Sequence, residues 1–551
     1  MQTCDQSFTH AWESWRAADG VSTLVGAGPG SWESVGEGGF RMHGAQLLLL
    51  VVGSIAVTAA ARRWDLPAPL LLVVVGLAIS FLPGADDYQL DPHILLGVVL
   101  PPLLYSASLD SSYLNFKAVA DPIIQLGVVL VVITAFAVGL LAHLLMPELP
   151  WEVALLLGAV VAPPDAVAAV AIGRKLGLPR GAMTVLTGES LVNDASALTL
   201  YKVALAGIAG ASTGLFAQLS TFVIAVVVGV AVGLAIGVVA HFARTHLDDT
   251  VLESVLGLVV PFACYLVAEE LYGSGVLAVV AAGLYLGHNS PKAGYATRLQ
   301  EQSVWTTVDV LLESLVFGLI GLELPFVLKG ISDFTVVPTV LALLGAVIVV
   351  RIVFVFGRNI LLRLVRRRRR RPSWKISAVL SWTGMRGVVT LAAAAGIPED
   401  TPGWAYIQFA AFVITVGTLL LQGISLPWLI RALKIQQPED SGQEQRARKA
   451  AAKAAKAMLS ELMPAEIPVE QRKAFGQRMH QMMQMRDRMI EQDPSQEGAI
   501  TRVRREMLAK QREVLVAERA AGRLDDDVMR KVMRELDLEE AMLAGTWRSR
   551  L

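Results

Sequence analysis

The feature that most constrains this chain is a succession of long apolar stretches that contain almost no charge. The stretches at 47–61 and 222–240 are examples, and 54% of the chain is apolar while only 17% is charged. A soluble domain carries nearer ~25% charged residues. A helix of ~20 apolar residues crosses a hydrocarbon layer about 30 Å thick. The sequence therefore predicts an all-α polytopic membrane protein, and it excludes a soluble enzyme, a nucleic-acid-binding protein and a disordered scaffold.

Apolar segments divide the chain into three parts. Residues 1–44 lack the order of a secretory signal and are interpreted as an N-terminal extension, with an over-extended start as the alternative. Residues 45–431 form the predicted transmembrane domain, and residues 432–551, rich in both signs of charge, predict a cytoplasmic helical tail. About thirteen membrane-crossing helices are expected, at 45–61, 66–83, 93–109, 119–145, 151–172, 182–206, 213–240, 251–270, 275–288, 305–328, 335–358, 375–397 and 403–431.

Charges in the connecting loops predict the orientation of these segments. Short cytoplasmic loops collect Lys and Arg. Alternate connections carry such residues, namely Arg62, Arg63, Lys117, Arg174, Lys175, Arg180, Arg244, Lys292, Arg298, Arg363 and the arginine run 366–371. The connections between them carry mainly acids, namely Asp86, Asp87, Asp91, Glu148, Glu399 and Asp400. This alternation places the N-terminus outside and the tail in the cytoplasm. The arginine run is interpreted as an anchor at an anionic lipid surface rather than a nucleic-acid site.

Ionisable residues within the apolar segments require a functional explanation, because a charge at bilayer depth costs at least ~2.5–3.5 kcal/mol. The sixth segment contains the densest group, the run from Thr187 to Asp194. At ~100° per residue, the side chains of Glu189, Ser190, Asn193 and Asp194 share one arc of the helix. Several hard oxygen atoms on one arc suit a small hard cation. A structural polar seam between helices is the alternative.

Two segments contain helix-breaking residues beside a charge. In segment five, Pro163 and Pro164 precede Asp165, and in segment twelve Gly384 and Gly387 flank Arg386. If segments 1–6 and 8–13 form two inverted six-helix repeats, segments five and twelve correspond. Inverted-repeat transporters place their interrupted, crossing helices at such positions and bind the substrate at the membrane midplane. The alternative for segment five is a simple helix kink in which Asp165 has hydrogen-bond partners and binds no ion.

Three further charged residues receive separate interpretations. Arg386 needs a partner, and the acids of segments five and six are available to it, so it is expected to compensate a carboxylate. Arg351, toward the cytoplasmic end of segment eleven, is expected to snorkel to the interface. Glu313 is interpreted either as a residue of the ion pathway or as structural glue between helices.

These motifs resemble those of the sodium/proton exchangers of the bacterial NhaP and eukaryotic NHE type. The run from Thr187 to Asp194, the run from Pro163 to Ala166 and the run from Gly384 to Gly387 match the motifs of segments six, five and twelve, and the similarity covers roughly 45–431. The resemblance implies a homodimer with dimerisation and core subdomains that works by alternating access. It also implies a plasma-membrane protein that needs no enzyme chemistry and no cofactor, and that contacts membrane lipid but no nucleic acid.

The resemblance also assigns roles to matching residues. Asp165, Ser190 and Asp194 would bind Na⁺, with Glu189 shaping the site and Asn193 supporting it. Proton and cation would compete for Asp194. The Asn-Asp pair implies electroneutral one-for-one exchange, serving pH and sodium homeostasis. Pro164 stands where many members have Thr, which leaves Na⁺, Li⁺ and K⁺ as candidate cations and a K⁺/H⁺ antiporter as the alternative function.

Two rival functions use the same acids. A cation channel is disfavoured because paired broken helices favour alternating access. An intramembrane aspartyl protease would pair Asp165 with Asp194, but the sequence contains no Gly-x-Gly-Asp motif to support it. The chain also shows no P-loop, so an ion gradient is the expected energy source. The two cysteines, Cys4 and Cys264, predict no disulfide framework.

Overall fold

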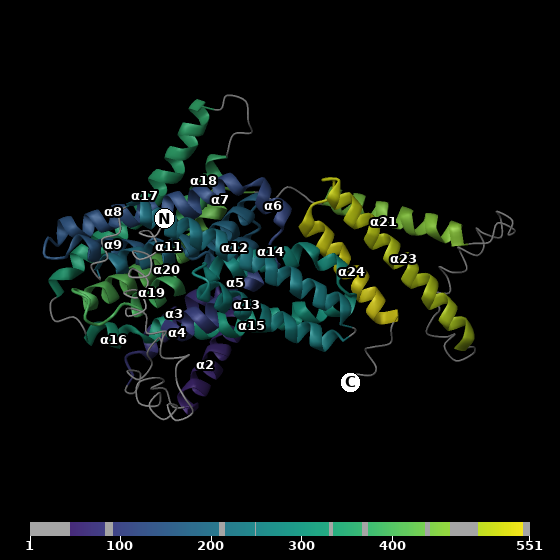
Figure 1. Ribbon diagram of the computed structural model, residues 1–551, viewed down its shortest axis with the longest axis horizontal. Helices are drawn as coiled ribbons and strands as arrows, with labels where there is room; N and C mark the ends of the chain where they lie inside the picture. The colour runs from purple at the N-terminus through teal and green to yellow at the C-terminus, as the bar shows by residue number, and fades with distance from the viewer. Residues whose placement is uncertain are drawn as a thin grey trace, which may run out of the picture.

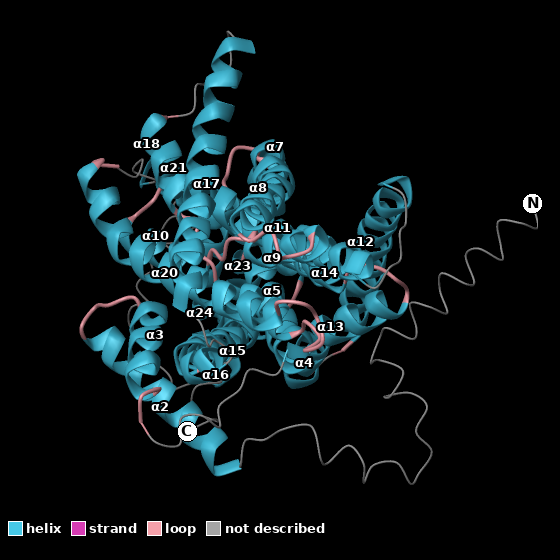
Figure 2. Ribbon diagram, turned by 90° about the vertical axis from the view of Figure 1, so that its left-hand side faces the viewer, coloured by secondary structure: helices cyan, strands magenta, loops and turns pink. Residues whose placement is uncertain are grey.

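The computed structural model describes residues 44–82, 92–208, 215–247, 249–329, 334–365, 373–435, 441–462 and 494–543. Within these ranges all regular structure is helical (Figure 2). Six helices there are long and apolar enough to cross a membrane, and shorter apolar helices accompany them. The prediction of an all-α membrane protein is therefore confirmed. The number of crossings, their orientation and the inverted repeats stay predictions. The N-terminal extension and the arginine run 366–371 lie outside the described residues.

One set of helices packs closely together, and we call it the scaffold bundle. In it α12 and α13 pack on α14, α14 packs on α5, and α15 packs on α2 and α3. Its members are α2 (Gly44–Arg63), α3 (Ala68–Ile79), α5 (Leu100–Leu109), α12 (Leu215–His246), α13 (Thr250–Glu270), α14 (Gly275–Asn289) and α15 (Tyr295–Leu322).

The second set, which we call the crossing bundle, contains both interrupted segments. In it α8 and α11 pack on α9, while α17 packs on α8, α18 and α20. Its members are α7 (Ala120–Ile124), α8 (Leu130–Leu145), α9 (Trp151–Val161), α10 (Val167–Leu176), α11 (Arg180–Ile208), α17 (Val337–Val365), α18 (Trp374–Trp382), α19 (Val388–Ala395) and α20 (Trp404–Ala432). The two bundles meet where α11 contacts α14, α19 contacts α15 and α20 contacts α3.

Short elements connect these helices. They are α4 (Pro92–Ile94), the π-helical turns η4 (Leu95–Val99) and η5 (Gln125–Val129), α6 (Tyr113–Ala118), the 3₁₀ turns η6 (Ser290–Lys292) and η7 (Phe334–Val336), and α16 (Leu324–Lys329). Each of the thirteen predicted apolar segments coincides with one helix or with two or three consecutive helical elements. Segments five and twelve coincide with the pairs α9–α10 and α18–α19, so both predicted interruptions are confirmed.

The described part of the tail forms a small helical unit of its own. It consists of α21 (Ser441–Leu462), α23 (Pro494–Ala520) and α24 (Asp526–Leu543), and each of the three packs on the other two. Its core contains Ala451, Leu508, Leu515, Val532 and Met533. Figure 1 shows this unit, in yellow-green and yellow, against one end of the scaffold bundle beside α13, α14 and α15.

Glycines allow helices to approach closely within each bundle. In the scaffold bundle a Cβ atom at Gly76 of α3 would lie 2.7 Å from the carbonyl oxygen of Gly318 and 2.9 Å from the Cα of Gly321, both on α15. In the crossing bundle a Cβ at Gly139 of α8 would lie 3.0 Å from the Ala154 oxygen of α9. Small residues at membrane helix contacts let the backbones meet, and van der Waals packing then holds them together.

We predict that Gly76→Val destabilises the scaffold bundle. The side chain would meet the backbone of α15, which cannot move aside, and overpacking of this kind costs about 1–3 kcal/mol. The measurement is thermal unfolding of the protein purified in detergent. Gly345→Val on α17 is the matched control, because a Cβ there meets nothing within 4 Å. Equal unfolding temperatures for the two variants would contradict the packing described here.

Candidate functional site

The two interrupted segments cross each other at their breaks. Residues 162–166 separate α9 from α10, and residues 383–387 separate α18 from α19. The backbone N–H of Asp165 donates to the carbonyl oxygen of Met385 at 2.6 Å. The N–H of Arg386 donates to Oγ1 of Thr418 on α20 at 2.9 Å. Backbone groups released by the breaks are thus satisfied inside the protein, as non-helical backbone at membrane depth requires.

The side chain of Arg386 completes this satisfaction. Its Nε donates to the carbonyl oxygen of Val161 at 2.9 Å, and Nη2 donates to that of Ala162 at 3.2 Å. A third bond joins Nη1 to the carbonyl oxygen of Gly384. These carbonyls lie at the end of α9 and in the break of segment twelve, where no helical N–H reaches them. Arg386 therefore holds the two broken segments together through their backbones.

Asp165 lies at the N-termini of the two half-helices that follow the breaks. Its Oδ1 accepts a hydrogen bond from the N–H of Val167, the first residue of α10, at 2.8 Å. It also accepts from the N–H of Val388, the first residue of α19. Helix N-termini carry partial positive charge, which favours a carboxylate at this place. A Cβ atom at Gly387 would overlap the Asp165 carboxylate, so only glycine permits this approach.

Helix α11 brings its polar arc against the same crossing. The Nδ2 of Asn193 donates to the carbonyl oxygen of Pro164, and its Oδ1 is buried without a partner among the described residues. Asp194 is 5% exposed and lies within electrostatic range of Asp165. In the described part of the chain, Asp194 accepts no hydrogen bond and forms no ion pair.

Glu189 is the third acid of the site, and it is committed to Arg351. The Arg351 guanidinium makes a bidentate pair with it, Nη2 to Oε2 being 3.0 Å and Nη1 contacting Oε1. Arg351 Nε also donates to the carbonyl oxygen of Leu380 on α18, and the Arg351 residue is 2% exposed. The expectation that Arg351 snorkels is therefore wrong. The carboxylate pairing expected of Arg386 belongs to Arg351 instead, because α17 passes beside α11 and Arg386 is occupied by carbonyls.

The other predicted residues form fewer side-chain interactions. Ser190 lies one turn before Asp194 on the same face of α11. Neither Ser190 nor Thr187 forms a side-chain hydrogen bond with another described residue. Pro163 and Pro164 are buried in the break. Glu313 on α15 is half-buried and lies within electrostatic range of Asp309 and Asp165, so it faces the crossing from the scaffold bundle.

Two interrupted helices that cross inside a membrane, with a buried and unengaged carboxylate beside them, define a secondary transporter of small cations. The family model described as "Sodium/hydrogen exchanger, transmembrane" matches residues 47–432. The chain belongs to the sodium/hydrogen exchanger family.

Relatives and solved structures agree with this assignment. An uncharacterised Na⁺/H⁺ exchanger of Mycobacterium tuberculosis is 30% identical over 93% of this chain and 98% of its own length. The Na⁺/H⁺ antiporter ApNhaP of Aphanothece halophytica is 30% identical over 73% of this chain and 77% of its own. The sodium proton antiporter MjNhaP1 of Methanocaldococcus jannaschii has a similar fold, with a TM-score of 0.55, 23% identity and coverage of 71% of this chain and 98% of that one.

Sequence reasoning did not find several residues that build the site. Thr418 acts through a backbone contact, which leaves no pattern in one sequence. Gly387 was expected only as a helix breaker, and its close approach to the Asp165 carboxylate was not predicted. Arg351 gave a usable signal, because it stands in a run of β-branched apolar residues. Asp309 gave a signal of the same kind, being one helical turn from Glu313.

We predict that Arg351→Gln destabilises the protein strongly. Removing one partner of a buried ion pair leaves Glu189 uncompensated, which costs about 3–5 kcal/mol. Thermal unfolding in detergent is the measurement. The double variant Arg351→Met with Glu189→Met removes both charges and should recover most of the stability. Equal losses in the single and double variants would show that the pair is not the source of the effect.

Proposed function

We propose that this protein exchanges one Na⁺ for one H⁺ across the plasma membrane. The observation that carries the proposal is that the three acids at the crossing have different partners. Glu189 is held by Arg351, and Asp165 accepts two backbone N–H groups at the helix ends. Asp194 alone among the three has no fixed partner among the described residues, so it is the group free to take up and release an ion.

The chemistry of exchange follows from competition at Asp194. A carboxylate binds either a proton or a small hard cation, and a proton on the oxygen removes the charge that the cation needs. Asp165, Ser190 and Asp194 would supply oxygen ligands to Na⁺, while Asn193 fixes α11 against the break in segment five. Na⁺ and H⁺ then occupy the site in turn, which gives one-for-one exchange without a cofactor.

Alternating access would come from movement of the crossing bundle against the scaffold bundle. Every residue assigned to the ion site lies in the crossing bundle, and Glu313 faces it from the scaffold bundle. The scaffold bundle would provide the homodimer contact implied by the family resemblance. The N-terminus would lie outside and the tail in the cytoplasm, as the loop charges predict.

The proposal of Na⁺ as the transported cation has alternatives, namely Li⁺ and K⁺. Pro164 offers no hydroxyl ligand beside Asp165. An antiporter of Bacillus pumilus that is 28% identical to this chain is named for sodium, potassium, lithium and rubidium. We propose Na⁺ as the main substrate in pH and sodium homeostasis, with Li⁺ and K⁺ compared in the same assay.

We predict that Asp194→Asn abolishes exchange while the protein still folds, because the amide cannot alternate between a proton and a cation. The measurement is dissipation of a pH gradient in inside-out vesicles on addition of Na⁺, Li⁺ or K⁺. Glu270→Gln is the control, an exposed acid at the end of α13 outside the site. Retained exchange in Asp194→Asn would remove this residue from the ion site. Cation flux that exceeds proton flux would indicate a channel.

A further inference from the structure

A single peptide unit in the break of segment twelve connects the ion site to α20. The carbonyl oxygen of Met385 accepts from the N–H of Asp165 at 2.6 Å, and the N–H of the next residue, Arg386, donates to Oγ1 of Thr418 at 2.9 Å. This carbonyl and this N–H belong to one planar trans peptide, so they point in opposite directions and turn together. The bond to Thr418 and the position of the Asp165 backbone are therefore coupled through one rigid unit.

The hydroxyl of Thr418 is itself oriented for this bond. It donates to the carbonyl oxygen of Thr415, three residues earlier on α20, at 3.1 Å. With its hydrogen directed there, the oxygen offers a lone pair to the Arg386 N–H. A run of hydrogen bonds thus leads from α20 through the peptide to Asp165, and bonds in such a run strengthen one another.

The same peptide lies close to the Asp165 carboxylate. This carboxylate accepts the N–H groups of Val167 and Val388, the first residues of α10 and α19, and Val388 is only two residues beyond Arg386. A Cβ atom at Gly387 would overlap the carboxylate. A shift of the backbone in the break would therefore move both the main chain of Asp165 and a donor to its side chain.

The break cannot hold this peptide in place by itself. Residues 383–387 are not helical, so no ladder of helical hydrogen bonds runs through them. Gly384 and Gly387 flank the peptide, and glycine restricts the backbone less than any other residue. The orientation of the peptide therefore depends on its partners outside the segment, which are Asp165 on one side and Thr418 on the other.

Helix α20 also holds segment twelve on either side of the break. Before the break, Nε1 of Trp382 donates to Oγ of Ser425 at 2.8 Å. After it, Nε2 of Gln408 donates to the carbonyl oxygen of Ala394 at 2.6 Å. Thr418 lies between Gln408 and Ser425 along α20, so the three contacts follow segment twelve in antiparallel order. Of the three, the Thr418 contact is the one made to the non-helical residues.

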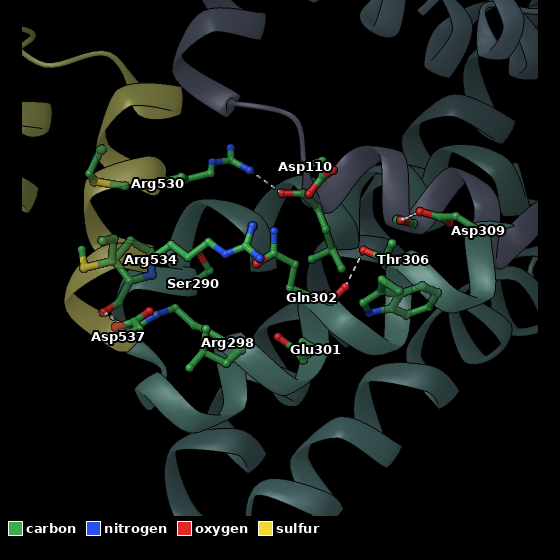
Figure 3. Close-up of a pocket in the computed structure, with 18 residues that line it drawn as sticks. Asp110, Ser290, Arg298, Glu301, Gln302, Thr306, Asp309, Arg530, Arg534 and Asp537 are labelled. Atoms are coloured by element: carbon green, nitrogen blue, oxygen red, sulfur yellow. Dashed lines mark hydrogen bonds and ion pairs between the residues drawn. The ribbon is translucent and has the colours of Figure 1, made fainter. Parts of the chain in front are cut away.

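The bond between Arg386 and Thr418 is closed to water. Thr418 is 0% exposed and Arg386 is 2% exposed. The cavity of about 200 Å³ between α15 and α24 (Figure 3) does not reach them, because its lining residues lie within 106–110, 287–309 and 529–537. A buried N–H that loses its acceptor has to find another one. Turning the peptide toward a new acceptor would carry the Met385 carbonyl away from Asp165.

We propose that Thr418 is a positioning residue of the ion site, which fixes the Met385–Arg386 peptide and thereby the cation ligand Asp165. The inference rests on the proposed function, because that function assigns Asp165 to the Na⁺ site. Thr418 acts through the peptide and does not touch the ion. Loss of its hydroxyl should therefore weaken cation binding more than it lowers the maximal rate of exchange.

The test removes the hydroxyl and keeps the shape of the side chain. In the full-length chain, Thr418→Val loses the acceptor and Thr418→Ser keeps it. Initial rates of pH-gradient dissipation in inside-out vesicles, measured over a range of Na⁺ concentrations, give an apparent KM and a maximal rate. The KM of Thr418→Val should rise about tenfold, the lower end of the loss in affinity when a residue that orients a metal ligand is removed. Thr418→Ser should keep the KM of the unmodified protein.

Thr134→Val is the matched control. Thr134 lies on α8 of the same bundle, is 1% exposed, and donates from its hydroxyl to the carbonyl oxygen of Leu130 in its own helix at 2.7 Å. The same substitution at similar burial thus removes a hydroxyl that does not reach the break, and the KM should stay unchanged. Thermal unfolding of each variant in detergent distinguishes a change in KM from a loss of stability.

A further variant covers the case in which Thr418→Val fails to fold. Thr418→Cys keeps a small polar side chain, but a thiol is a weaker hydrogen-bond acceptor than a hydroxyl. Its KM should exceed that of Thr418→Ser. Binding is also measured without transport, because a ligand that binds only the folded state raises the unfolding temperature. The rise caused by Na⁺ should be smaller for Thr418→Cys than for Thr418→Ser.

The outcomes separate this role from the transport function. A KM that rises in Thr418→Val or Thr418→Cys, and not in Thr418→Ser or Thr134→Val, supports the positioning role. An unchanged KM in the folded variants overturns it and leaves the exchanger intact, even where the unfolding temperature or the maximal rate falls. Absence of cation-dependent exchange in the unmodified protein and in all variants overturns the proposed function itself.

Discussion

The structure depends on one constraint, the need to satisfy backbone groups released by two broken helices at membrane depth. Neither break is stable alone, because an unpaired carbonyl or N–H in hydrocarbon costs several kcal/mol and no water is at hand. Each break supplies what the other lacks. Met385 accepts from the Asp165 N–H, and Arg386 donates to the carbonyls at the end of α9. The crossing is thus a single unit, and the acids of the site are placed by it.

The three acids differ in function because they differ in what surrounds them. Glu189 faces a guanidinium that reaches it from α17 and also donates to α18, so its pair with Arg351 fastens three helices together. Asp165 faces backbone dipoles, which orient it without neutralising it fully. Asp194 faces neither. Under the proposed function, three carboxylates near one crossing would therefore serve as a structural tie, a fixed ligand and an exchangeable ligand.

The sequence predicted the features whose energetic cost can be recognised from neighbouring residues alone. Charge-free segments, paired prolines and the glycines around Arg386 each break a local rule, so the membrane class, both interruptions and the acids near the crossing could be predicted. Partner choice could not be predicted in this way. Arg351 and Arg386 are both lone cations in apolar segments. Which of them meets Glu189 depends on the position of α17, which packs on α18 and whose Val355 shares an apolar cluster with Val185 of α11. The contact of α24 with α15 could not be predicted either, because it depends on how the charged tail packs against helices far away in the sequence.

The count of formal charges in the crossing has an energetic consequence. Three carboxylates, those of Asp165, Glu189 and Asp194, stand against two guanidiniums, those of Arg351 and Arg386. One net negative charge is left, and one bound Na⁺ or H⁺ would cancel it. Moving a unit charge through a membrane potential involves about 2.3 kcal/mol per 100 mV. Under the proposed one-for-one exchange, a crossing bundle loaded with either ion would carry no net charge at the site. The membrane potential would then do no work on it, and the two concentration gradients alone would set the direction of transport.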